Sequence, residues 1–103
     1  MRPISLIAIV LVLTTFASVA QAKTTKSGFL ASTSQELLIE ALAYAATKDE
    51  DAYNKIITTG DVFALKGGLE VEIVETDISK GLVKIRPRGE TVELWTDIEA
   101  VGD

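Results

Sequence analysis

The sequence predicts an α+β domain in which one or two N-terminal helices pack on a small antiparallel β-barrel of five strands. Three observations support this prediction. Residues 62–101 consist of short β-type runs separated by turns that contain glycine or proline, and residues 34–59 carry apolar side chains at helical spacing. Residues 1–22 have the order of a secretory signal. A chain of 103 residues suits a single small domain.

The first 22 residues resemble a signal peptide. Arg2 supplies a short positive region, residues 4–13 are apolar apart from Ser5, and Ala20-Gln21-Ala22 has the small residues of a cleavage site. We therefore expect cleavage after Ala22 and a periplasmic or secreted protein that keeps no stable membrane anchor. The alternative is an uncleaved anchor, because the 17 residues from 4 to 20 reach the short end of a bilayer-spanning helix.

Charge and residue types exclude several functional classes. Residues 23–103 contain nine basic and 15 acidic residues, a net charge of −6, which argues against a nucleic-acid partner. The chain has no cysteine, so no disulfide and no acylated cysteine stabilises or anchors it. It also has no histidine, which removes Ser-His-Asp and Cys-His catalysis and ordinary zinc sites. We expect no enzymatic activity, no cofactor and no metal.

Residues 23–31 are mostly polar, and we interpret them as a flexible tail that precedes a helical lead-in over residues 32–60. Thr33 followed by Glu36 has the spacing of a capping box, which predicts the helix start. The apolar stripe that follows comprises Leu37, Leu38, Ala41, Leu42 and Ala45. Further apolar residues at 39, 43 and 46 predict a helix that is covered on more than one side.

The charged run at residues 48–51 interrupts the helical pattern. Asp49 is a good N-cap for a second helix, and Gly60 is a suitable residue to follow its end. One helix from residue 34 to 59 with a bend at Asp49 is the alternative. Tyr44 and Tyr53 are interpreted as residues at the edge of the core, with ligand stacking as the alternative.

Residues 61–103 are predicted to form the barrel. The expected strands are 62–65, 69–74, 82–86, 91–95 and 100–101, with a polar loop at 76–81, a tight turn at 87–90 and one helical turn at 96–99. Charge pairing predicts the register: Glu72 opposite Lys84 and Val74 opposite Leu82 in the first hairpin. In the next hairpin it places Glu93 opposite Lys84 and Trp95 opposite Leu82.

Three segments of this region resemble bacterial Src-homology-3-like (SH3-like) domains: Lys66-Gly67-Gly68-Leu69-Glu70-Val71, Val83-Lys84-Ile85-Arg86, and the stretch from Leu94 to Val101. The resemblance covers about 40 residues and implies an SH3-like barrel. Exported bacterial members of this family bind cell-wall material or proteins. Leu65 runs almost directly into Gly67-Gly68, so the aromatic-rich loop of the eukaryotic polyproline site is missing and that activity is not implied.

The predicted register places an apolar patch and a cationic strip on the outer face of the barrel. These form the candidate partner surface: Trp95, Leu82, Val74, Lys84, Arg86 and Arg88. The patch is covered either by the N-terminal helices or by a ligand. The cations either bind an anion or pair with neighbouring glutamates.

The leading functional hypothesis is a non-catalytic, exported binding module of the bacterial cell envelope, with an envelope protein or a cell-wall polymer as its partner. The alternative is a small inhibitor or immunity-type protein that acts on an envelope enzyme or a phage component. An enzyme that relies on carboxylates alone is the third and weakest hypothesis.

Overall fold

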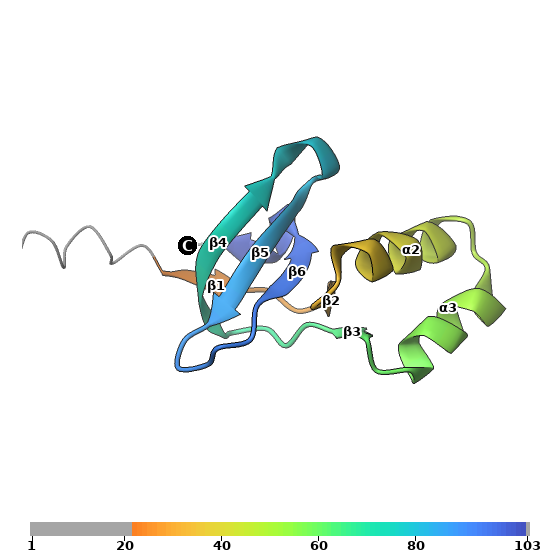
Figure 1. Cartoon of the computed structure of the whole chain (residues 1–103), viewed down its shortest axis with the longest axis horizontal. Coiled ribbons are helices and arrows are strands. Elements are labelled where there is room, and N and C mark those ends of the chain that lie inside the picture. Colours follow the sequence, from red (N-terminus) through yellow and green to blue (C-terminus); the bar gives the residue numbers. More distant parts are fainter. Residues whose placement is uncertain (1–21, 103) are drawn as a thin grey trace, which may run out of the picture.

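The computed structural model describes residues 22–102, so the predicted signal sequence lies outside the described residues. The described chain is α+β, with two α-helices and seven strands. Figure 1 shows these elements in chain order: β1 (Lys23–Thr25), β2 (Leu30–Ser32), α2 (Gln35–Ala46), α3 (Glu50–Thr58), β3 (Val62–Ala64), β4 (Glu70–Asp77), the 3-10 turn η1 (Ile78–Lys80), β5 (Leu82–Pro87), β6 (Leu94–Asp97), the 3-10 turn η2 (Ile98–Ala100) and β7 (Val101–Gly102). Between residues 22 and 102, neither helix is long and apolar enough to cross a membrane.

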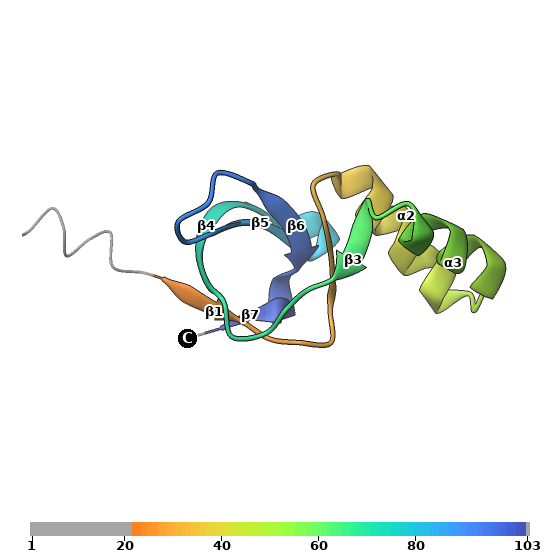
Figure 2. The same ribbon diagram turned by 90° about the horizontal axis from the view of Figure 1, so that it is seen from below.

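The strands form one open antiparallel sheet of seven strands, and the expectation of a closed five-stranded barrel is wrong. The strand order is β3-β2-β6-β5-β4-β1-β7, so β3 and β7 lie at the two ends. Figure 2 shows that the sheet is strongly curved, with β4, β5 and β6 arching over β1 and β7. The two strands that the sequence did not predict, β1 and β2, both lie in the interior of the strand order.

The expected flexible tail therefore belongs to the sheet. Strand β1 lies between β4 and β7, and β2 lies between β3 and β6. The Thr25 side chain is buried, and its hydroxyl donates to the Lys66 carbonyl (2.7 Å) and accepts from the Leu69 amide (2.9 Å). Ala31 and Ser32 are fully buried. Backbone pairing satisfies the polar groups of such short strands, so a polar composition does not keep them out of the sheet.

The helical lead-in forms two helices and not one bent helix. Ser34 caps α2, because its hydroxyl accepts from the Leu37 amide (3.2 Å), so the predicted capping box that starts at Thr33 is wrong by one residue. Lys48 adopts a positive φ of 59° after the end of α2. Asp49 caps α3 as predicted, accepting from the Ala52 amide (3.3 Å), and Gly60 follows that helix with a φ of 81°.

The core has two parts. One apolar cluster lies inside the curved sheet and comprises Ala31, Leu65, Val71, Val83, Ile85, Leu94 and Ala100. The second joins the helices to the outer face of the sheet and comprises Leu38, Ala41, Ile56, Val62, Leu82 and Trp95. The opposite face of α2 stays exposed at residues 39, 43 and 46, so the described chain covers this helix on one side only.

The register of both hairpins differs from the prediction by two residues. Glu72 pairs with Arg86 and not with Lys84, and Lys84 pairs with Trp95. The predicted loop at 76–81 is shorter than expected, because β4 continues to Asp77, and a bulge between residues 73 and 75 shifts the pairing again. The shift is two residues before the bulge and three beyond it. The faces of β5 are unchanged, so the predicted inward residues Val83 and Ile85 are still buried.

Candidate functional site

The apolar residues of the predicted partner surface lie in two different settings. Trp95 is 8% exposed and Leu82 is 2% exposed, and both pack in the cluster that joins the helices to the sheet. The protein's own helices therefore cover this pair, which is one of the two alternatives that the sequence left open. Val74 is the additional residue of the β4 bulge and is 43% exposed, and it no longer lies opposite Leu82.

The three cations of that surface each lie beside a carboxylate. Arg86 pairs with Glu72, and Arg88 Nη1 lies 3.3 Å from Glu70 Oε2. Lys84 Nζ lies 3.5 Å from Glu75 Oε1 and 3.7 Å from Glu93 Oε1. The outer face of β4 and β5 is thus a row of compensated charges, as the ion-pairing alternative describes.

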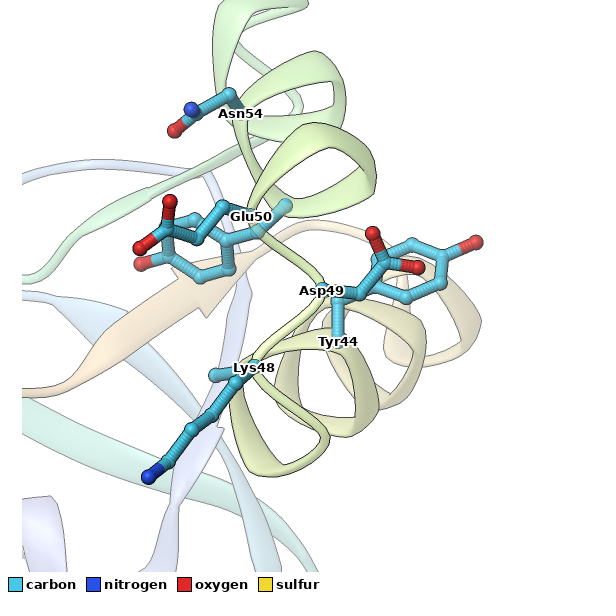
Figure 3. A pocket seen from close by; sticks show the side chains of 7 residues that line it. Tyr44, Lys48, Asp49, Glu50 and Asn54 are labelled. Carbon is cyan, nitrogen blue, oxygen red and sulfur yellow. The ribbon is translucent and has the colours of Figure 1, made fainter.

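A second candidate site lies where α2 meets α3; the sequence indicated it only through the ligand-stacking alternative for Tyr44 and Tyr53. It is an open hollow of about 510 Å³, within the range of roughly 300–1,000 Å³ that is common for ligand sites. We call it the junction hollow. It is lined by Tyr44, Ala45, Lys48, Asp49, Glu50, Tyr53 and Asn54 (Figure 3).

A further hollow of about 550 Å³ lies next to the first, and Tyr44 and Asp49 line both. We call it the interhelix groove. Its lining combines apolar side chains from both helices with charged ones and comprises Leu37, Glu40, Tyr44, Asp49, Asp51, Ala52, Lys55, Ile56 and Thr59.

The local backbone explains how the junction hollow forms. The left-handed conformation of Lys48 ends α2, and the Asp49 cap starts α3 in a new direction. Glu50 and Asn54 are four residues apart on α3 and therefore lie on the same side of the helix. Figure 3 shows both side chains extending to that side, whereas the Lys48 ammonium points away from the Glu50 carboxylate.

Tyr44 is the fixed side chain between the two hollows. Its hydroxyl donates to Glu40 Oε1 (2.8 Å), and its ring packs at the edge of the helix–sheet cluster. This hydrogen bond is the main cause that raises the pKa of Tyr44, followed by desolvation and by the negative charges of Glu40 and Asp49. The phenol therefore stays neutral at ordinary pH, and its ring direction is held by the bond to the preceding helical turn.

The charges of the helix pair are less compensated than those of the sheet. Four carboxylates and two lysines line the two hollows, and among residues 22–102 no ion pair joins them. Asp49 is occupied as a helix cap, and Glu40 accepts from Tyr44. Glu50 and Asp51 lie in the first turn of α3, where negative charge is favourable.

The residue types present limit the chemistry of the site. The sequence contains neither histidine nor cysteine. Within the described part of the chain, no group of three or more potential metal ligands comes together. The lining of the hollow supplies aromatic rings together with carboxylate, ammonium and amide groups.

The sequence signal that could have indicated this site is the pair of tyrosines on either side of the charged run at residues 48–51. Comparison with known proteins finds no matching family model, no similar curated protein and no similar solved structure.

Proposed function

We propose that this protein is a non-catalytic, exported binding module of the bacterial cell envelope, and that it binds a protein partner through its two helices. We call α2 and α3 together the helical arm. The observation that carries the proposal is the position of the arm: it projects from one side of the sheet, and the junction of its helices is the part farthest from the sheet (Figures 1 and 2).

The composition of the arm supports binding over catalysis. Its inner face is anchored on the sheet by Leu38, Ala41 and Ile56, and its outer end carries the junction hollow. An element that is packed at its base and exposed at its end is suited to docking, because binding then costs little conformational entropy. The resemblance of residues 66–101 to bacterial SH3-like domains, which bind proteins or cell-wall material, supports the same class of function.

The inhibitor or immunity-type hypothesis uses the same surface, and the identity of the partner separates the two. An envelope enzyme that loses activity when the arm docks would support the inhibitor. A structural envelope protein would support the binding module.

Site-specific photocrosslinking tests the proposal. The full-length protein is produced in its native host with a photoreactive phenylalanine at Asn54, in the junction hollow, or at Thr91, on the loop between β5 and β6. We expect one crosslinked protein of defined mass from position 54 and none from position 91. If neither position gives a crosslink and the protein sediments with purified peptidoglycan, the partner is a cell-wall polymer and not a protein.

Export is tested separately. Mass spectrometry of the protein recovered from the envelope fraction should find Lys23 as the first residue. A full-length product that stays in the membrane fraction would show that residues 1–22 act as an anchor.

A further inference from the structure

We infer that the junction hollow binds a lysine or arginine side chain of the partner, presented by an extended segment with an apolar residue beside the cation. This inference rests on the proposed binding function and names the chemistry of the segment that the arm recognises. Three properties of the hollow support it: its aromatic lining, a lining carboxylate that forms no ion pair among the described residues, and the interhelix groove beside it.

The aromatic lining is the first property. Tyr44 and Tyr53 line the same hollow, one from each helix, and both are half-buried. A cation is attracted to an aromatic ring when it lies within about 6 Å of the ring centre. The protein already uses this contact elsewhere, where Lys84 Nζ lies 5.3 Å from the centre of the Trp95 ring.

The charge of the hollow is the second property. Among residues 22–102, Glu50 forms no ion pair, and the nearby Lys48 ammonium points away from it (Figure 3). On the sheet, by contrast, Glu70, Glu72, Glu75 and Glu93 each lie beside a cation.

The third property explains why the occupant is a peptide segment and not an isolated small cation. The hollow is open, and it shares Tyr44 and Asp49 with the neighbouring interhelix groove. The lining of that groove includes the apolar side chains of Leu37, Ala52 and Ile56. A segment whose cation enters the hollow therefore places its neighbouring residue over apolar surface, which favours a leucine-like side chain at that position.

Nuclear magnetic resonance titration tests the inference. The isotope-labelled, purified protein is titrated with the peptide acetyl-Gly-Arg-Leu-Gly-amide and with the same peptide carrying citrulline, which is neutral and nearly identical in shape. We expect saturable shifts of backbone amides in residues 44–54 with the arginine peptide, and binding weaker by roughly tenfold with the citrulline peptide.

Variants locate the site. Glu50→Gln and Tyr53→Leu should each weaken binding of the arginine peptide by roughly two- to fivefold. Glu36→Gln is the matched control, because Glu36 is an exposed carboxylate on α2 that lines neither hollow, and it should leave the affinity unchanged. The helical circular dichroism signal of each variant checks that the arm is still folded.

Several results would overturn the inference. Equal binding of the arginine and citrulline peptides would show that the cation is not recognised. Shifts spread over all acidic surfaces, or binding that survives both Glu50→Gln and Tyr53→Leu, would show that the hollow is not the site. If a partner is still crosslinked at position 54 while the peptide fails in these ways, the binding function stands and only the proposed ligand chemistry is wrong.

Discussion

The Lys84 ammonium lies 5.3 Å from the centre of the Trp95 ring, and the two residues are direct cross-strand partners on β5 and β6. The same ammonium also faces the carboxylates of Glu75 and Glu93. Trp95 is thus enclosed by the apolar side chains of the helical arm and by a charged side chain of its own sheet. This contact connects the row of ion pairs on the sheet with the helix–sheet cluster.

Replacing Lys84 by methionine keeps most of the aliphatic length but removes the charge. We expect the free energy of unfolding to fall by about 0.5–1 kcal/mol at low salt, because a partly exposed cation–π contact and two ion pairs are lost. Urea denaturation followed by Trp95 fluorescence measures the change. Lys66→Met is the control, and a loss of the same size in that variant would mean that net charge, and not this contact, is responsible.

Leu38→Ala should lower the free energy of unfolding by about 2–5 kcal/mol, since Leu38 is fully buried between α2 and the sheet. The neighbouring variant Ile39→Ala should cost about 0.5 kcal/mol or less, because Ile39 is 38% exposed. Thermal denaturation by circular dichroism, with Trp95 fluorescence in parallel, measures both. Loss of the helical signal before the fluorescence change would contradict one cooperative unit of arm and sheet.

Ser34→Ala should destabilise the protein by about 0.5–2 kcal/mol, because it removes the acceptor for the Leu37 amide at the start of α2. Thr33→Ala should have little effect, since Thr33 is exposed and does not cap the helix. Chemical denaturation of the two variants distinguishes the observed cap from the capping box that the sequence suggested. The reverse order of effects would place the cap at Thr33.

The Asp77 carboxylate accepts from the Ser79 hydroxyl (2.8 Å) and from the Gln35 side-chain amide (2.9 Å). These two bonds, Ser79 first, lower the pKa of Asp77 below its usual value of 3.8. The carboxylate therefore contributes stability above pH 3.8, and this contribution is lost as the pH falls through the lower pKa of the folded state.

Carboxyl-carbon magnetic resonance titration checks this shift. Ser79→Ala should raise the pKa of Asp77 more than Gln35→Ala does, because the Ser79 bond is the larger cause. Asp61→Asn, at an exposed aspartate, is the control and should leave the titration of Asp77 unchanged. A larger effect of Gln35→Ala would mean that the link between α2 and β4 dominates instead.

Local signals in the sequence predicted the helices well. The Asp49 cap, the glycine at position 60 and the apolar stripe each depend on residues within one or two helical turns. Tertiary packing did not override these local preferences. The inward alternation of β5 also holds at Val83 and Ile85. Trp95 was correctly recognised as an outward residue in need of cover, although only the structure shows that the helical arm supplies it.

Features that depend on residues far apart in the sequence could not be predicted from local patterns. Strands β1 and β2 have three residues each, too few to show an alternation, and their pairing partners lie at the far end of the chain. The register depended on a bulge at Val74 and on the short η1 turn, neither of which leaves a charge pattern. The junction hollow depends on the angle between α2 and α3, which follows from the backbone of Lys48.

The interior position of β1 and β2 has a consequence for when the protein can fold. Ala31 of β2 pairs with Thr96 of β6, and Thr25 of β1 pairs with Val101 of β7. A nascent chain that stops before β6 can therefore pair β1 only with β4 and β2 only with β3, and each of these strands still lacks its second neighbour. Contacts between such distant residues slow folding, commonly to the order of milliseconds to seconds. The sheet can therefore be complete only once β6 and β7 have both been synthesised.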